Sequence, residues 1–119
     1  MFSPQLLDHF EHPRNSGTVP APDATVQLQN PACGDVLKLT LKVAAGYITD
    51  IRFLAKGCVP CIACASALTE LVLGNTVADA RALRREQLVN AVGGLPPASS
   101  HASRLALDAL HAALDQLPG

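Results

Sequence analysis

The sequence predicts an α+β fold in which a three-stranded antiparallel sheet is packed by helices. Three consecutive segments between residues 25 and 55 alternate apolar with polar residues, and the segments on either side have helical spacing and helix caps. Apolar residues make up 49% of the 119 residues and aromatic residues only 3%, so we expect helices that pack through small side chains. This length fits one domain, residues 1–119, with one core.

The first expected element is a short helix over residues 3–12. Ser3 can cap it, Pro4 suits its first position, and Pro13 ends it. His9 and His12 look like surface residues of this helix, as His111 does in the last one. The stretch that follows, PRNSGTVPAPDA, is rich in proline, glycine and asparagine and is typical of a loop.

Three strand signals come next, in TVQLQN (25–30), VLKLTLKV (36–43) and YITDIRFLA (47–55). The AAGY segment between the last two predicts a hairpin turn, so these strands are antiparallel neighbours. One face of such a sheet must be covered, and the helices that follow in the chain can cover it.

Four helices are expected after the sheet, over residues 60–73, 76–83, 85–92 and 99–117. Pro60 fits the first position of the first of these helices, and Gly74 lies just past its end. Thr76 can cap the second, and Ser99 or Ser100 the last. The last helix carries its leucines on one stripe, at 107, 110, 114 and 117.

Charge and hydropathy exclude several classes of function. The formal net charge of -1 argues against a nucleic-acid-binding surface or a polybasic membrane surface. No apolar run approaches the roughly 18 residues that span a bilayer, and the N-terminus lacks the pattern of a signal peptide. We therefore expect a cytoplasmic protein, in which clustered cysteines are reduced and serve as metal ligands or reactive thiols.

Three of the four cysteines lie in CVPCIAC, residues 58–64, and the fourth is Cys33 in PACGD. Cys33 falls in a turn between two expected strands, and Cys58 follows Gly57 at the end of the third strand. Adjacent strand ends can bring these two cysteines together, and a long-range pair of this kind indicates a metal site. Asp35 adds an oxygen ligand two residues after Cys33.

The other two cysteines have different settings. Cys61 would lie in the first turn of a helix, where exposed amides and the helix dipole favour the thiolate that binds metal or attacks sulfur. Local sequence alone does not decide whether Cys61 is a reactive thiol or a core residue. Cys64 shares an apolar stripe with Leu68 and Leu71, which favours core packing.

His101 is the histidine of interest. It falls at the start of the last expected helix, where the dipole disfavours the imidazolium and leaves a neutral ring that can bind metal. The alternative is a partly exposed surface histidine, which the spacing alone favours.

Several motifs occur in a fixed order: DHFEHPRNSG, PACGDVLKLTLKV, a glycine-cysteine pair that opens a helix, LTELVLGNT, and LPP followed by a histidine. Together they resemble the iron-sulfur cluster assembly scaffolds of the IscU, SufU and NifU N-terminal family, from about Pro4 to Leu114. The resemblance implies an IscU/SufE-like fold and a non-enzymatic scaffold or carrier. Such scaffolds take sulfur from a cysteine desulfurase and iron from a donor, build a transient 2Fe-2S cluster, and pass it to acceptor apo-proteins.

The resemblance also implies a ligand set. In the family, three cysteines plus an aspartate or histidine hold the cluster, or a zinc ion in its place. By position, the matching residues here are Cys33, Asp35, Cys58 and His101. They are the expected cluster and metal ligands.

This chain departs from the family pattern at position 102. Many members have a cysteine there, as third ligand and persulfide acceptor, whereas this chain has Ala102. Cys61, one turn into the helix that Cys58 precedes, is near enough to replace the missing ligand. A second interpretation is a zinc-binding or regulatory relative that has lost cluster assembly. A CxxC thiol-disulfide protein using Cys58 and Cys61 ranks third, because an antiparallel sheet lacks the βαβ context of such proteins.

A chaperone motif is also altered. The LPPVK segment by which bacterial scaffolds engage a dedicated Hsp70-type chaperone appears here as LPPAS, residues 95–99. The lysine is gone, which disfavours that partner.

Overall fold

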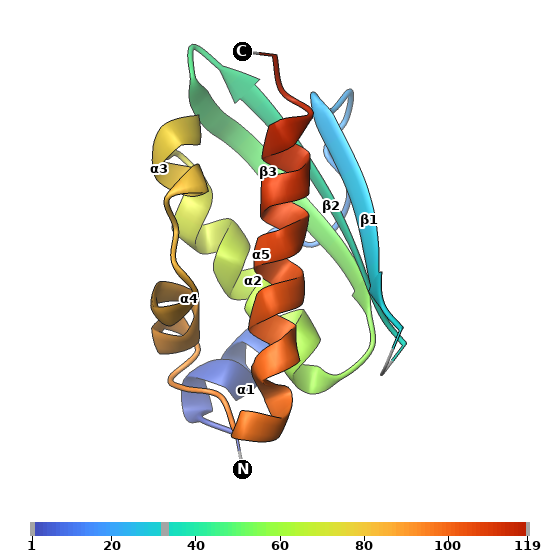
Figure 1. Ribbon diagram of the computed structural model, residues 1–119, viewed down its shortest axis with the longest axis vertical. Coiled ribbons are helices and arrows are strands. Elements are labelled where there is room, and N and C mark those ends of the chain that lie inside the picture. Colours follow the sequence, from blue (N-terminus) through green and yellow to red (C-terminus); the bar gives the residue numbers. More distant parts are fainter. Residues whose placement is uncertain (1, 32–33, 119) are drawn as a thin grey trace.

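The computed structural model describes residues 2–31 and 34–118 and has the expected α+β architecture (Figure 1). The elements in chain order are α1 (Pro4–Glu11), β1 (Ala24–Asn30), β2 (Asp35–Ala44), β3 (Tyr47–Lys56), α2 (Val59–Val72), α3 (Val77–Arg81), α4 (Arg85–Ala91), the 3-10 helix η1 (Pro97–Ser99) and α5 (Ser100–Asp115). The sequence prediction missed η1. No helix of the described residues has the length and apolarity needed to cross a bilayer.

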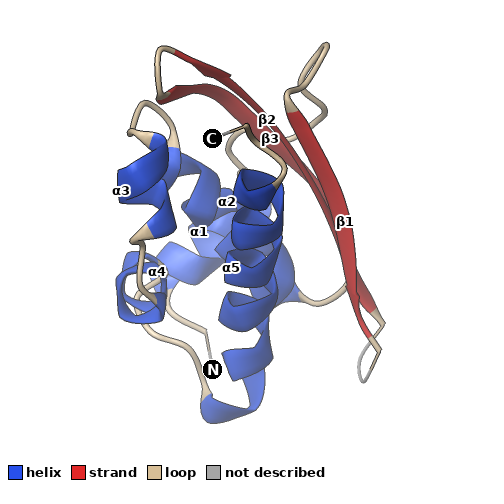
Figure 2. Cartoon of the chain, turned by 45° about the horizontal axis from the view of Figure 1, so that its top comes forward, coloured by secondary structure: helices blue, strands red, loops and turns tan. Residues whose placement is uncertain are grey.

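The three strands form one antiparallel sheet in the order β1-β2-β3. Asn30, the last residue of β1, pairs with Asp35, and Lys56, the last residue of β3, pairs with Val36. The end of β1, the start of β2 and the end of β3 therefore lie at the same edge of the sheet. Figure 2 shows the sheet as one layer and the helices as the other.

The inner face of the sheet supplies much of the core. In β2 the buried leucines alternate along the strand, at positions 37, 39 and 41. In β3 both Ile48 and Ile51 are fully buried although they are three residues apart. The register shifts between Lys42 and Val43, so β3 carries one extra residue that restores the inward direction.

Helices α2 and α5 cover this face. α2 contacts β3 and α5, and α5 also contacts β1 and β2 (Figure 1). The buried residues of α2 are mostly small, among them Ala63, Cys64, Ala65 and Ala67. Small side chains let the helix approach its neighbours closely, which confirms the packing expected from composition. Cys64 is fully buried in the core, as predicted.

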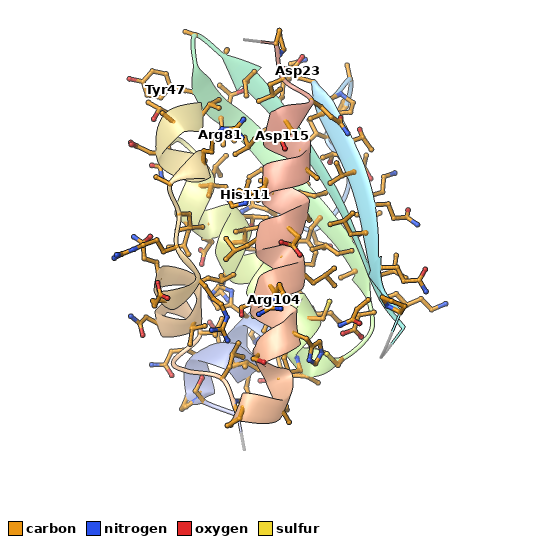
Figure 3. All side chains as sticks on the ribbon, viewed as in Figure 1. Asp23, Tyr47, Arg81, Arg104, His111 and Asp115 are labelled. Carbon is orange, nitrogen blue, oxygen red and sulfur yellow. The ribbon has the colours of Figure 1, made fainter. Side chains whose placement is uncertain are left out.

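Two of the predicted helix caps are confirmed. Ser3 Oγ accepts the Leu6 N–H at 2.9 Å, and Thr76 Oγ1 accepts the Asp79 N–H at 3.0 Å. Ser99 precedes α5, but its side chain makes no capping hydrogen bond within the described residues. Near the other end of α5, Asp115 pairs with Arg81 of α3 at 2.7 Å (Figure 3).

His9 is not a surface residue, contrary to the prediction, because only 8% of it is exposed. Its Nδ1 lies 2.8 Å from Ser66 Oγ on α2, and its Nε2 lies 3.5 Å from a carboxylate oxygen of Glu70. The Arg14 N–H donates to the same serine oxygen at 2.9 Å. These contacts fasten α1 and the segment after it to α2.

We expect His9 to make stability depend on pH. Burial lowers the pKa of His9 below its ordinary value of 6.5, and the charge of Arg14 acts in the same direction, while Glu70 and Asp8 oppose it. As pH falls below 6.5, the unfolded chain takes up a proton at this ring before the folded chain does, so the free energy of unfolding decreases. Urea unfolding of the wild type and of His9→Asn between about pH 5 and pH 8 measures this difference.

In His9→Asn that part of the pH dependence should disappear, although the variant is less stable at every pH. His12→Asn is the control, because His12 is exposed. A His9→Asn profile parallel to that of the wild type would contradict the assignment.

Candidate metal centre

Three predicted ligands meet at one edge of the sheet, each placed by a different element. Asp35 is the first residue of β2, Cys58 is the N-cap of α2, and His101 lies in the first turn of α5. The antiparallel register brings the start of β2 beside the end of β3, which leads into Cys58. Because α5 packs across β1 and β2, its first turn can reach the same edge.

The ligand atoms of these side chains form a small triangle. Cys58 Sγ lies 3.1 Å from Asp35 Oδ2 and 3.8 Å from His101 Nε2. The His101 Nε2 atom lies 3.4 Å from the same Asp35 oxygen. Among the described residues, these three form a group whose ligand atoms all lie within 4.8 Å of one another.

The triangle has the size of one face of a tetrahedral metal site. Zinc bonds of about 2.0 to 2.3 Å to nitrogen, oxygen and sulfur place neighbouring ligand atoms about 3.3 to 3.8 Å apart. The distances of 3.1, 3.4 and 3.8 Å are close to this range. A metal ion therefore needs only small side-chain movements to be bound by all three, and a fourth ligand would complete the tetrahedron.

Asp35 is the most buried member, with 1% of the residue exposed. Its Oδ1 accepts the backbone N–H of Cys58 at 3.0 Å, which leaves Oδ2 facing the cysteine sulfur and the imidazole. The Cys58 side chain makes no capping hydrogen bond, and the Asp35 carboxylate accepts the N–H of this N-cap residue itself. A negative charge at a helix N-terminus is favourable, which helps to hold the carboxylate there.

The other residues considered as ligands are not part of this group of three. Cys33 lies outside the described residues. The residue after it, Gly34, has φ +73, and its N–H donates to the Asn30 carbonyl at 2.7 Å. Cys61 is 1% exposed and is not part of the group of three. Ala102, which stands at the position of the missing cysteine, is also 1% exposed.

Cys64 has the properties of a core thiol. Burial raises its pKa to about 12, and the nearby Cys58 adds to the shift, while Arg85 opposes it. The Cys64 thiol therefore stays protonated at neutral pH, which disfavours metal binding.

His101 also lines an open cleft on the surface, which sequence reasoning did not anticipate. Residues from the end of β1 and from α5 form its walls: Gln29, Asn30, Pro31, Arg104, Leu105 and Asp108. Figure 3 labels Arg104 on α5. Arg104 follows His101 by three residues, and this spacing places both side chains on one face of the helix. The spacing was the signal in the sequence from which this wall of the cleft could have been predicted. The imidazole of His101 therefore borders a cleft that is open to the surface.

Comparison with known proteins identifies the family. The whole chain, residues 1–119, matches the NifU-like N terminal domain. The chain belongs to this family. It is 40% identical over 114 residues to "Iron-sulfur cluster assembly scaffold protein IscU 1" of Archaeoglobus fulgidus, covering 96% of this chain and 74% of that protein. It is 39% identical over 117 residues to the IscU scaffold protein of Haemophilus influenzae, covering 95% and 92% respectively.

A solved structure has the same fold. The N-terminal part of a nitrogen-fixing NifU-like protein from Brucella abortus superposes with a TM-score of 0.80 over 97% of this chain and 92% of that chain, at 22% identity. The family resemblance and the fold class expected from the sequence motifs are thus confirmed.

The site depends on the glycine before Cys58. Gly57 has φ +151, and a Cβ at this position would overlap the Asp35 carboxylate and lie 3.0 Å from the Asp35 Cα. We expect Gly57→Ala to displace Asp35 and lower zinc affinity at least about tenfold, as other changes that misorient ligands do. Competition with a chromogenic zinc chelator measures the affinity.

Gly17→Ala is the matched control, because its φ of +126 also lies in the range that favours glycine, while the atom nearest to the added Cβ, Arg52 Cδ, is 3.8 Å away. Equal zinc affinity in both variants would show that the position of Asp35 does not depend on Gly57.

Proposed function

We propose that this chain is a scaffold on which an iron-sulfur cluster is assembled and from which it passes to acceptor apo-proteins. The observation that carries the proposal is the convergence of Asp35, Cys58 and His101, whose ligand atoms lie within 4.8 Å of one another. This group occurs in a chain of the NifU-like N-terminal family, whose relatives are named as iron-sulfur cluster assembly scaffolds.

Each ligand has a chemical role in this proposal. Thiolates suit iron-sulfur centres, so Cys58 is the first ligand, and Cys33, two residues before Asp35 in the chain, is the second. His101 Nε2 and Asp35 Oδ2 complete the set. A carboxylate oxygen binds iron-sulfur centres less strongly than a thiolate does. A mixed ligand set therefore suits a 2Fe-2S cluster that is cargo and must leave.

The proposal implies partners and a compartment. A cysteine desulfurase supplies the sulfur and an iron donor the metal, in the cytoplasm, where thiols stay reduced. The chain itself is a scaffold rather than an enzyme. In the family, an Hsp70-type chaperone contacts a lysine that follows the two prolines. This contact is lost here, because Ala98 and Ser99 follow Pro97.

A zinc-binding relative is the second candidate function. The triangle of ligand atoms fits tetrahedral zinc, and Ala102 removes a thiolate that cluster assembly commonly uses in this family. The two functions differ in the metal retained and in whether sulfide is bound with it.

Anaerobic reconstitution with iron and sulfide distinguishes them. A scaffold should give a coloured protein with visible absorption and equal amounts of labile iron and sulfide, and His101→Ala should shorten the cluster's lifetime at least about tenfold. His12→Ala is the control, because His12 is an exposed histidine outside the group of three ligands. A colourless wild-type protein that retains one zinc ion would favour the second function.

The role of Cys61 as the replacement for the missing cysteine ligand is still a prediction. If Cys61 binds the cluster, Cys61→Ser lowers cluster yield much more than Cys64→Ser does, and Asp35→Asn has little effect. Since Asp35 Oδ2 lies within the group of three and the Cys61 sulfur does not, we expect Asp35→Asn to have the largest effect. Cluster yield per chain, from iron and sulfide analysis of the three variants, decides between these ligands.

A further inference from the structure

The outer edge of β1 is a hydrogen-bonding surface beside the metal centre. β1 is an outermost strand of the sheet, with β2 as its neighbour (Figure 2). In an antiparallel sheet the N–H and C=O of one residue point to the same side, and successive residues alternate between the two sides. Thr25 points away from β2, because both its backbone groups bond the Gln116 side chain, the N–H at 3.0 Å and the carbonyl at 2.7 Å. The backbone groups of Gln27 and Gln29 therefore point outward as well.

The opposite edge of the sheet, on β3, is paired within the chain. Phe53 exchanges two backbone hydrogen bonds, of 2.8 and 3.0 Å, with residues 15–17. Ile48 exchanges two of 2.8 Å with residues 74–75. These contacts cover that edge at two places and make it a poor site for a further strand.

On β1 the unpaired stretch is short and well defined. Gln116 occupies the backbone groups of Thr25 at one end, and Pro31, which has no N–H, follows the strand at the other. Between these limits, no segment of the described residues pairs with the outward groups of Gln27 and Gln29. An unpaired strand edge is where a protein can accept an extended segment of another chain.

This edge also borders the cleft beside His101. Gln29 lines one side of the cleft, and the first half of α5 lines the other. α5 runs alongside β1 in the opposite direction, because His101 at its start lies by the end of β1 and Gln116 at its end bonds Thr25 (Figure 1). A strand added to β1 would therefore turn every second side chain toward α5.

The charges on this side of α5 match the spacing of such a strand. Arg104 and Asp108 line the cleft, are exposed, and are four residues apart, which is about 6 Å along a helix axis. Side chains on one face of a strand repeat every two residues, or about every 6.6 to 6.8 Å. Among the described residues, neither charge belongs to an ion pair. An acidic and a basic residue two positions apart on the strand can pair with both.

We propose that the edge of β1 binds an extended segment of a partner protein as a fourth, antiparallel strand. The backbone of Gln27 and Gln29 pairs with the segment, and Arg104 and Asp108 select its side chains. An antiparallel strand on β1 runs in the same direction as α5, so its acidic residue comes first, opposite Arg104, and its basic residue two positions later, opposite Asp108. The recognised segment is therefore an extended acidic-x-basic sequence.

The place of this edge gives the docked segment a role. His101 borders the same cleft, and its Nε2 lies 3.8 Å from Cys58 Sγ of the metal centre. Residues that precede the acidic residue of the segment are therefore held toward the metal centre. This role in exchange with a partner rests on the proposed scaffold function, whereas the strand pairing does not. Pairing through only two residues of β1 suits a partner that must leave again.

The test uses a synthetic peptide as the partner segment. The peptide Thr-Glu-Thr-Lys-Thr, blocked at both ends, turns Glu and Lys toward α5 and places its last two threonines opposite Gln29 and Gln27. It is titrated into the ¹⁵N-labelled protein, and the backbone amide shifts in NMR spectra give the affinity and the place of binding. The control peptide has the same sequence and charges, with N-methyl groups on those two threonines, which removes the N–H donors.

We expect the amide signals of Gln27 and Gln29 to shift, and the N-methylated peptide to bind at least about tenfold more weakly. Exchanging Glu and Lys in the peptide should weaken binding to the wild type about three- to fivefold. A double variant, Arg104→Glu with Asp108→Lys, should prefer the exchanged peptide by a similar factor. Arg84→Glu is the control variant, because Arg84 is an exposed arginine outside the cleft, and it should keep the wild-type preference.

Equal affinity for the plain and the N-methylated peptide would overturn the proposal, as would shifts that leave out Gln27 and Gln29. A dimer of the peptide-free chain that the peptide dissociates, seen by analytical ultracentrifugation, would also overturn it, because a second copy would then occupy the edge. Cluster reconstitution is measured on the same wild-type protein. A chain that binds the peptide but holds no cluster refutes the scaffold function alone. A chain that holds a cluster but does not bind the peptide refutes the docking site alone.

Discussion

The hydrogen bond between the buried Asp35 carboxylate and the Cys58 N–H is the contact on which the site depends. Removing a carboxylate from water is unfavourable unless hydrogen bonds or opposite charge replace the lost hydration. Asp35 is 1% exposed, and its replacement partners come from two other elements: the first turn of α2, and His101 of α5. These contacts exist when β2, α2 and α5 are packed together, so the site forms with the fold.

The same contact explains the sequence around it. The chain must turn from β3 into α2 directly above Asp35, where a Cβ on residue 57 would overlap the carboxylate. Glycine is required there, and the alanines along α2 let the helix lie close to β3 and α5 behind it. A metal cation bound to this cluster offsets the charge of the buried carboxylate, so metal binding stabilises the packing of the three elements as well as the site.

Local patterns in the sequence were sufficient to predict the strands and the α-helices, because each of these elements carries its own signal, whereas the short η1 was missed. Alternation marked the strands, while Ser3 and Thr76 marked helix starts that the structure confirms. Features that depend on distant partners could not be predicted in this way. His9 has the spacing of a buried residue beside Leu6, but its polar ring is stable there only because Ser66 lies 57 residues away in the chain. The β3 irregularity that buries both Ile48 and Ile51 has no local signal either.

The site was predictable only in part for the same reason. Cys58 follows a strand and begins a helix, which local chemistry indicates, whereas helical spacing alone favoured a surface position for His101. Local chemistry also indicated Asp35 as an oxygen ligand, whereas the match to family motifs selected His101. The structure places His101 Nε2 3.4 Å from Asp35 Oδ2. Local sequence did not decide whether Cys61 is a reactive thiol or a core residue, because a residue in the third helical position can be buried and still lie beside the N-cap.

A thiol at position 102 and the thiol of Cys61 would belong to different elements of the fold. A cysteine at position 102 would stand on α5 beside His101, as a further ligand from a separate element. Cys61 instead shares the first turn of α2 with Cys58, so it brings no further element to the site. Asp35 and His101 already bring β2 and α5 to the N-terminus of α2. We therefore propose that metal binding in this chain falls to Asp35 and His101 together with Cys58 and Cys33.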